Sequence, residues 1–454
     1  MKKIIYILFL FNFIISCQQE KQRIQVPVIF QGKIENAPAK KILLKGTNEK
    51  KIVEISLDSI NNFIDTLYIN EGYYKFLLGE QYTWLYLKPG NNLFMKLDYS
   101  LFDQSLKYEG EGAEINNYLA KKMLKGIDLR SLTSYNYYGK LDEDDFLKFT
   151  DDIYQQYDKL LIGLKDKKFL ELEKFRNKIL IIGLISKYPM IRAYLTKNPE
   201  YKVSDKFPNP FKNLDINDEK LLQVPNGKDI VIDYIDFITR DGLDDIDPYD
   251  KLKIINKEIK NQLLKEQIAA QEVRYSLLYT KKLEQYYQLF DSIVKDEALK
   301  TPIKEKYENY LALQPGALSP DFTAYDLNGK AYHLKDFAGK ALYIDLWATW
   351  CSPCRAEIPF LTKIKEKYKD KPINFLSFDV YDSENKWKEF VQQNNMTGWQ
   401  LINTDREMPF LKKYVVDGIP RFVLLDKEGK IVDANAPRPS NKSLIELIDK
   451  TIEK

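Results

Sequence analysis

The sequence holds little of the residue types on which several function classes depend. Its 454 residues include a single histidine, His333, and three cysteines. These are too few for multi-histidine metal chemistry or for a scaffold stapled by disulfides. Lys and Arg number 69 against 66 Asp and Glu, a formal charge of +3, which argues against the concentrated basic surface of a nucleic-acid binder. Beyond residue 16 no apolar run approaches the roughly 20 residues that span a bilayer, which excludes a polytopic membrane protein.

The first residues have the pattern of an export signal. Two lysines precede an almost entirely apolar stretch over residues 4–15, and Ser16 and Cys17 follow it. A basic start, a short apolar stretch and a small residue are typical of a signal peptide, and the stretch is short for a transmembrane helix. Ser16-Cys17 resembles the cleavage site of a bacterial lipoprotein, although Ile14 stands where that motif commonly has Leu. A signal anchor that is never cleaved is the alternative.

The lipoprotein resemblance implies that residues 1–16 are removed and that Cys17 becomes the lipidated first residue. Acyl chains would then hold the protein at a membrane surface, in the cell envelope on the periplasmic side, with residues 17–24 as a polar tether. Only Cys351 and Cys354 would remain as free cysteines. A closed loop this small adds little stability through chain entropy, so we expect the pair to serve chemistry.

Composition and periodicity divide the rest of the chain into three parts. Hydrophobic residues make up 44% and charged residues 30%, a folding composition. Residues 25–112 alternate short apolar runs with turn signals, which predicts a small antiparallel β-sandwich. Residues 113–312 carry apolar residues at three- and four-residue spacing, which predicts an α-helical domain with a break before Pro302. Residues 313–454 alternate strands and helices, and Ser440 is expected to cap the last helix.

The individual elements follow from the same signals. The predicted strands lie at residues 26–32, 41–46, 73–78, 83–87, 93–97, 341–347 and 373–380, with hairpins over 322–334 and 421–434. The predicted helices lie at residues 142–165, 168–195, 230–237, 249–263, 266–313, 352–369, 383–394 and 440–453. This order places a buried strand directly before the two cysteines and a helix directly after the first of them.

That placement gives Cys351 a specific chemistry. The N-terminus of a helix has unpaired backbone N–H groups and a partial positive charge, both of which stabilise a thiolate. An ordinary thiol has a pKa near 8.5, and Cys-x-x-Cys motifs at helix N-termini commonly lower it to roughly 3.5–7.5. We therefore expect Cys351 to be an exposed nucleophile and Cys354, one turn further on, to be a buried resolving thiol. Pro353 at the start of the helix loses no hydrogen bond.

The segment around the cysteines resembles a known family. Residues 347–359 read WATWCSPCRAEIP, and Gly418-Ile419-Pro420 follows later in the chain. This resembles the active-site segment of the TlpA/ResA-like branch of the thioredoxin superfamily, over residues 313–454. The resemblance implies an α/β thioredoxin fold and thiol–disulfide exchange without a cofactor, usually as an extracytoplasmic reductant. Less specifically, residues 110–119 resemble modules that precede thioredoxin domains in some lipoproteins.

Two acidic residues carry over from the family pattern. Asp345 lies six residues before Cys351, where thioredoxins place a buried acid, and its implied role is to accept the proton of Cys354. Burial raises the pKa of a carboxyl group, which suits it to proton exchange near neutrality. Glu357 matches the glutamate of the Cys-x-x-Cys-x-x-Glu-x-Pro pattern and is implied to tune thiol acidity. The alternatives are a hydrated Asp345 at a strand end and a Glu357 that only faces the helix dipole. The sequence shows no lysine partner for Asp345.

Three further residues are implied to bind the substrate. Trp350 matches the tryptophan before the first cysteine, although plain packing is as consistent with its position. Pro420 matches the family's cis-proline, and the backbone of Ile419 would face the disulfide and hydrogen-bond an extended substrate strand. Arg421 departs from the small residue often found after that proline, so substrate preference can differ.

Three other functions compete with a thiol–disulfide oxidoreductase. A zinc site needs about four ligands, and His333 is expected at the surface of its hairpin. A thiol peroxidase would carry Pro-x-x-x-Thr-x-x-Cys, but Ile344 and Ala348 occupy those positions. A non-enzymatic binding lipoprotein would work through its first two domains. We expect an enzyme that reduces or interchanges disulfides in exported proteins, recharged by a membrane electron donor.

Overall fold

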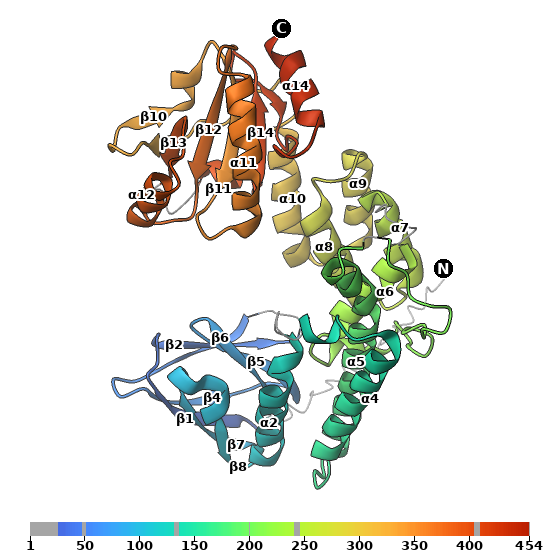
Figure 1. Cartoon of the computed structure of the whole chain (residues 1–454). Helices are drawn as coiled ribbons and strands as arrows, with labels where there is room; N and C mark the ends of the chain where they lie inside the picture. The colour runs from blue at the N-terminus through green and yellow to red at the C-terminus, as the bar shows by residue number, and fades with distance from the viewer. Residues whose placement is uncertain are drawn as a thin grey trace, which may run out of the picture. The chain divides into compact units, whose positions relative to one another are not determined.

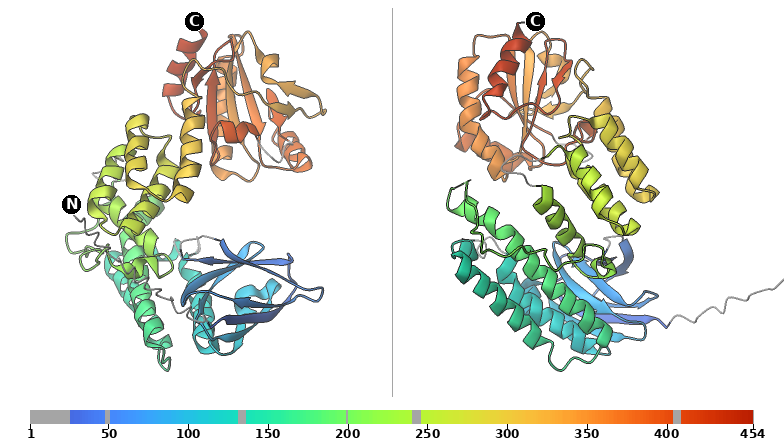
Figure 2. Two further views of the ribbon diagram at one scale, coloured as in Figure 1. Left: turned by 180° about the vertical axis from the view of Figure 1, so that it is seen from behind. Right: turned by 90° about the vertical axis from the view of Figure 1, so that its right-hand side faces the viewer.

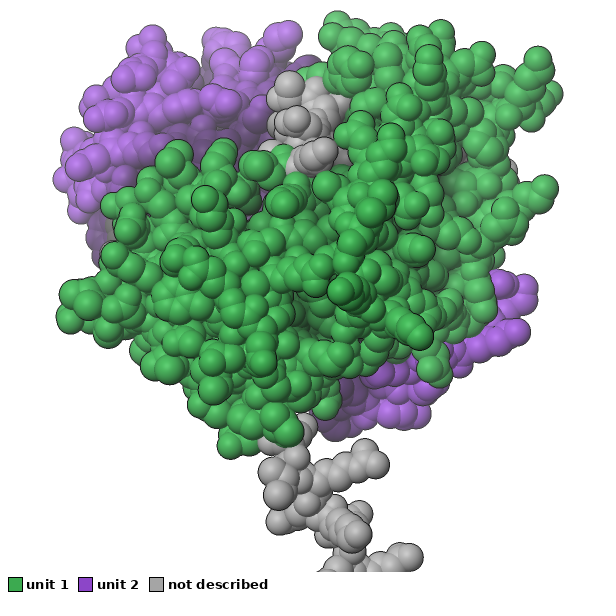
Figure 3. Space-filling view, turned by 90° about the horizontal axis from the view of Figure 1, so that it is seen from below, with its two compact units in different colours: residues 1–237 green, residues 238–454 purple. Residues whose placement is uncertain are grey.

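The computed structural model describes residues 26–47, 51–130, 136–198, 200–239, 246–403 and 409–453. The chain divides into two compact units, residues 1–237 and residues 238–454 (Figure 3). The helical region expected over residues 113–312 is shared between them. The predicted signal peptide, Cys17 and the tether lie outside the described residues. Within those residues, no helix is both long and apolar enough to cross a bilayer.

Unit 1 begins with two β-sheets that enclose an apolar core (Figure 1). The sheets have the strand orders β4-β1-β7-β8 and β3-β2-β5-β6. Their strands are β1 (Val28–Glu35), β2 (Lys41–Gly46), β3 (Lys51–Ser56), β4 (Asn62–Leu67), β5 (Gly72–Leu78), β6 (Gln81–Leu87), β7 (Asn92–Asp98) and β8 (Lys107–Gly110). Side chains along β1 alternate between buried and accessible because one face of the sheet covers the core. The expectation of a purely antiparallel sandwich was wrong: β1 pairs with β7 in parallel, since β2 to β6 form a long crossover between them.

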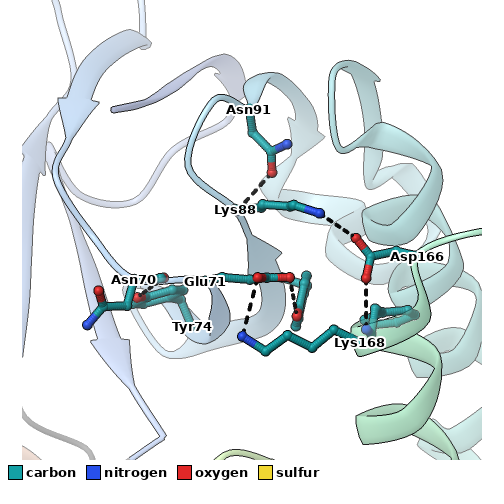
Figure 4. Close-up of polar contacts among 9 residues, drawn as sticks. Asn70, Glu71, Tyr74, Lys88, Asn91, Asp166 and Lys168 are labelled. Atoms are coloured by element: carbon teal, nitrogen blue, oxygen red, sulfur yellow. Dashed lines mark hydrogen bonds and ion pairs between the residues drawn. The ribbon is translucent and has the colours of Figure 1, made fainter. Parts of the chain in front are cut away.

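Polar contacts tie this sandwich to α5 (Lys167–Leu195), as Figure 4 shows. Lys88 pairs with Asp166 at 2.8 Å, and Lys168 pairs with Glu71 at 3.3 Å. Asp166 is also the N-cap of α5 and accepts a hydrogen bond from the Phe169 N–H at 2.9 Å. Partly exposed pairs such as these contribute little stability each. Because both pairs lie at the start of α5, they nevertheless fix the position of its first turn against the sheet.

A buried carboxylate on α5 makes a second connection. Glu173 accepts hydrogen bonds from the hydroxyls of Tyr73 on β5 and Tyr118 on α2 (Ala113–Arg130). Lys122 and Arg176 form ion pairs with it. Burial alone would raise the pKa of Glu173, but these two cations lower it to about 2. Glu173 therefore stays charged and fully paired, which is the condition under which a buried charge is tolerated.

The helices follow the predicted periodicity, and the run predicted over residues 266–313 is divided among three helices. Those up to the division between the units are α1 (Phe102–Ser105), α2, α4 (Glu143–Leu160), α5 and α6 (Gly227–Thr239). Unit 2 continues with α7 (Pro248–Glu258), α8 (Gln262–Ser276), α9 (Leu283–Ile293) and α10 (Glu297–Leu311). Pro189 lies inside α5 without ending it. The break expected before Pro302 is present: Val294 ends α9 in an extended conformation and Asp296 caps α10 by accepting the Ala298 N–H, while Pro302 itself lies inside α10.

The C-terminal part of unit 2 is a mixed sheet in the order β10-β9-β13-β12-β11-β14-β15. Its strands are β9 (Thr323–Tyr325), β10 (Ala331–His333), β11 (Ala341–Trp347), β12 (Ile373–Asp379), β13 (Trp399–Ile402), β14 (Arg421–Leu425) and β15 (Ile431–Asp433). Strands β11, β12 and β13 are parallel, and β14 is antiparallel to β11. All seven residues of β11 are buried, as a central strand requires. Strand β13 was not predicted.

Helices cover both faces of this sheet (Figure 2). On the face that carries Tyr343 lie α11 (Ser352–Lys367) and α14 (Ser443–Ile452). On the face that carries Ile344 lie α13 (Pro409–Lys413) and residues of α10, while α12 (Glu384–Gln393) packs near the end of β11. This is the thioredoxin fold that the resemblance implied. It places the start of α11 directly beyond the end of β11.

Candidate redox-active site

The two cysteines lie where β11 gives way to α11, bonded to each other. Cys351 is the N-cap of α11, and its sulfur accepts a hydrogen bond from the Cys354 N–H at 3.2 Å. The disulfide joins Cys351 and Cys354, so the structure represents the oxidised form. In the reduced form the same N–H and the helix dipole would stabilise a thiolate at Cys351. The geometry therefore favours Cys351 as the attacking sulfur.

The exposure of Cys351 differs from the prediction. Cys351 is 4% exposed and Cys354 is 3% exposed, so the expectation of an exposed nucleophile was wrong for the oxidised form. Both pack in an apolar cluster with Trp347, Trp387, Ile402 and neighbouring side chains. Trp387 and Ile402 belong to elements distant in the sequence, which is why the local motif did not reveal the burial. A substrate can therefore reach the disulfide only over a small area of surface.

Asp345 is buried on β11, the strand that leads to the two cysteines. It is 5% exposed, so the alternative of a hydrated carboxyl at a strand end is wrong. Burial raises the pKa of Asp345 to about 7, Lys365 acts to lower it and Glu357 acts to raise it further. A carboxyl with this pKa exchanges its proton near neutrality, as a proton acceptor for a buried thiol must.

Lys365 is the residue that sequence reasoning missed. It lies on α11, and its ammonium donates hydrogen bonds to Thr397 O at 3.0 Å and to Ser377 Oγ at 3.4 Å. Ser377 is paired with Asp345 across β11 and β12. Burial lowers the pKa of Lys365 to about 8, and the charge of Asp345 opposes that shift. Lys365 follows Cys354 by three helical turns, so it lies on the same helix face, and that spacing was the available signal.

Glu357 is held by a residue near the end of the chain. It is 8% exposed and accepts two hydrogen bonds from Ser440, one from the N–H and one from the hydroxyl, each at 2.9 Å. Ser440 is thus occupied, and the prediction that it caps the last helix was wrong, because α14 begins at Ser443 after Lys442. Glu357 also lies beyond the first turn of α11, so it does not serve the helix N-terminus.

The loop before β14 borders the disulfide. The Ile419–Pro420 peptide bond is cis, the form that the resemblance implied. Ile419 is half-buried and packs against the apolar cluster that contains both cysteines. On the other side Trp350 is 57% exposed and its ring lies 6.1 Å from the ring of Tyr381. Trp350, Ile419 and Pro420 are thus available at the surface that surrounds the buried disulfide.

Two further carboxyls, which were not predicted, support the segment before Cys351. Asp382 accepts a hydrogen bond from the Thr349 N–H at 2.5 Å. Burial raises the pKa of Asp379 to about 8. Burial would also raise the pKa of Asp382, but its hydrogen bonds, first that from Thr349, lower it. The charge thus resides on Asp382, where it fixes the backbone two residues before the nucleophile.

His333 lies apart from the cysteines. It ends β10, and its Nδ1 lies 3.4 Å from the Thr323 hydroxyl on the neighbouring strand. Within the described ranges, no group of three or more His, Cys, Asp or Glu side chains is arranged to hold a metal ion. The lone histidine thus makes a local contact within its hairpin.

Comparison with known proteins agrees with this geometry. The Redoxin family profile matches residues 314–446. The thiol-disulfide oxidoreductase ResA of Bacillus cereus (strain ATCC 10987 / NRS 248) is 31% identical over 148 residues, which cover 32% of this chain and 84% of that protein. The ResA protein of Bacillus anthracis is 33% identical over 131 residues, 28% of this chain and 75% of that protein.

A solved structure is similar over the same part. The thioredoxin domain of a thiol-disulfide oxidoreductase from Bacteroides vulgatus is 32% identical, covers 31% of this chain and 99% of that chain, and has a TM-score of 0.29. The assignment therefore rests on the sequence relatives and on the site. Through its C-terminal domain, this chain belongs to the ResA-like thiol–disulfide oxidoreductases of the thioredoxin superfamily.

Proposed function

We propose that this chain reduces or interchanges disulfides of exported proteins through Cys351 and Cys354. The observation that carries the proposal is the sulfur of Cys351 at the N-terminus of α11, bonded to Cys354 and following the strand that carries the buried Asp345. A lone structural disulfide would need neither the helix N-terminus nor the buried acid. A binding protein without activity would need none of the three.

The reaction would proceed in two exchanges that start from the reduced enzyme. The Cys351 thiolate attacks one sulfur of the client disulfide, forms a mixed disulfide and releases the other client sulfur as a thiolate, which takes a proton from water. Cys354 then gives its proton to Asp345 and attacks the sulfur of Cys351. That step releases the second client thiolate and closes the Cys351–Cys354 disulfide. The client gains two electrons from the enzyme and two protons: water supplies the first, and the second client thiolate takes the proton that Cys354 gave to Asp345. The enzyme loses two electrons and one proton, because Cys351 starts as a thiolate.

The pair of Asp345 and Lys365 suits the second exchange. Burial raises the pKa of Asp345 to about 7, so near neutrality the carboxyl can accept a proton and later release it. The nearby ammonium of Lys365 favours the charged form of Asp345 and so keeps that pKa within reach. Glu357 acts in the opposite direction. The three residues together set the pH at which Cys354 can be deprotonated.

We also propose where the enzyme works and how it is recharged. Residues 1–16 would be removed and Cys17 lipidated, which would hold the mature chain at a membrane on the periplasmic side, with residues 17–24 as the tether. The oxidised pair would then regain two electrons from a membrane electron donor that presents a dithiol. The pattern of charge and hydropathy at the start of the sequence supports this location.

The test uses the whole chain with its cysteines varied singly. The reduced parent chain should reduce insulin, and Cys351→Ser should abolish that activity. Cys354→Ala should instead accumulate mixed disulfides with client proteins through Cys351, because no resolving thiol remains. Insulin reduction that survives Cys351→Ser would contradict the proposal, and so would the absence of any disulfide-linked client in cells grown under oxidising conditions. Peroxide consumption without insulin reduction would favour a peroxidase.

A further inference from the structure

A buried lysine of α10 contacts the loop that borders the disulfide. The ammonium of Lys306 donates hydrogen bonds to the carboxylate of Asp417 and to the backbone oxygen of Arg274 on α8. The side chain of Lys306 is 9% exposed, whereas that of Asp417 is 50% exposed. A lysine is rarely buried unless its charge is paired. Asp417 opens the segment that continues to Pro420, so the contact acts on that segment.

The same helix lies near the other end of the loop. Arg421, directly after Pro420, is 6% exposed and donates from Nε to Ala434 O at 3.0 Å. Tyr310, one turn beyond Lys306 on α10, lies close enough for its hydroxyl and Arg421 to affect each other's pKa. Tyr310 and Ile419 also pack against one apolar cluster of the sheet. Helix α10 therefore lies near residues on both sides of Pro420.

Other charged and titratable groups face this loop. Tyr381 lies near Asp417: burial raises the pKa of Tyr381, and the charge of Asp417 adds to that rise. Tyr381 in turn lies beside the exposed Trp350. Asp417 thus lies beside the surface, formed by Tyr381 and Trp350, over which a client would approach the disulfide. Lys306 forms the ion pair with Asp417, and the charge of Asp417 also acts on the buried Arg421.

We infer that Lys306 is a positioning residue for client binding and that α10 belongs to the catalytic unit. By fixing Asp417, Lys306 holds residues 417–420 where their backbone meets an extended client segment beside Cys351. Helix α10 ends at Leu311, before the Redoxin match begins at residue 314. The inference rests on the proposed function, which supplies the client. It assigns to a helix outside the matched domain a part in recognising protein substrates.

The inference predicts that loss of the Lys306 charge weakens the binding of a protein substrate and leaves the reaction with a small disulfide unchanged. A protein client lies along the loop, whereas 5,5′-dithiobis(2-nitrobenzoate) reacts at Cys351 and is too small to follow it. Lys306→Met keeps the length of the side chain and removes the charge, and the Asp417 it leaves is half exposed and can be solvated. We expect the KM for insulin to rise about fivefold, the factor of an ion pair worth about 1 kcal/mol. The kcat for insulin and the rate with the small disulfide should stay near the parent values.

Matched variants of the full chain complete the experiment. Lys306→Arg retains the charge and should restore most of the parent KM. Lys300→Met removes a lysine of the same helix whose partner is Asp291 at 2.8 Å, away from the loop, and should equal the parent. Asp417→Asn should raise the KM as Lys306→Met does, and it serves as the probe if Lys306→Met fails to fold.

The outcomes distinguish the inference from the proposed function. An unchanged KM in both Lys306→Met and Asp417→Asn, beside an active parent, would overturn the inference alone. Equal losses with insulin and with the small disulfide would also overturn it, because they would show a change in thiol chemistry and not in client binding. A parent chain that reduces no disulfide would overturn the proposed function and the inference together.

Discussion

Replacing Asp345 with Asn should slow the resolving exchange and also raise the free energy of unfolding. The substitution keeps the shape of the side chain and removes the group proposed to accept the proton of Cys354. A positioned general base contributes roughly 10²- to 10⁴-fold to a rate, so the resolving exchange should slow by a factor in that range. With a pKa of about 7, Asp345 is about half ionised at pH 7 and about a tenth at pH 6. The parent rate should therefore fall about fivefold between these pH values, and the variant should lose this dependence.

The stability effect follows from the same pKa. The folded state holds a proton on Asp345 up to about pH 7, whereas the unfolded chain releases it near 3.8. The unfolded state thus binds fewer protons between these values, so folding stability is lost as the pH rises from about 4 to about 7. The raised pKa corresponds to a loss of about 4 kcal/mol at pH 8. Asp345→Asn should recover most of it at pH 8 and little near pH 4.

Two measurements check this prediction. Chemical denaturation of the oxidised chains at pH 4 and pH 8 gives the free energies of unfolding, and rapid mixing of the reduced chains with a client gives the lifetime of the mixed disulfide. Asp370→Asn, which changes an exposed carboxyl of the same domain, is the control and should match the parent. The prediction is refuted if Asp345→Asn is less stable than the parent at pH 8. It is also refuted if the variant keeps the acid limb of the pH profile, which is the fall in rate between pH 7 and pH 6.

Further predictions concern the surroundings of the same site and the start of the chain. Lys365→Met should move the acid limb of the pH profile to higher pH, because the ammonium lowers the pKa of Asp345; an unmoved limb in a folded variant would exclude that coupling. Glu357→Gln should move the limb to lower pH, because Glu357 raises that pKa, with the loss of a charged acceptor for Ser440 measured as a lower melting temperature. Cys17→Ser should release the protein from the membrane fraction, measured by fractionation of cells, and a variant that stays membrane-bound would rule out the lipid anchor.

Much of the fold could be predicted because its signals are local. The continuous apolar run of β11 and the helical spacing after Cys351 are properties of short segments, and both elements form as predicted. The parallel pairing of β1 with β7 could not be predicted, since it depends on where a long crossover returns the chain. The break expected before Pro302 lies between α9 and α10, and capping by Asp296, a local signal of a helix start, sets its position upstream of the proline.

The site shows the same division between local and distant information. The motif itself placed Cys351 at a helix N-terminus, and the family resemblance implied that Asp345 is buried, as it is. The burial of Cys351 depends on Trp387 and other residues that arrive from elsewhere in the chain. Lys306 and Asp417 are separated by 111 residues, so no pattern in the sequence links them.

The acidity of Cys351 is the most direct test of the whole account. In a chain that carries Cys17→Ser and Cys354→Ala, Cys351 is the single thiol, and its alkylation rate by iodoacetamide can be followed from pH 4 to pH 10. Stabilisation by the N-terminus of α11 predicts a midpoint between roughly 3.5 and 7.5. A midpoint near 8.5, the value of an ordinary thiol, would contradict the claim that the fold activates this sulfur.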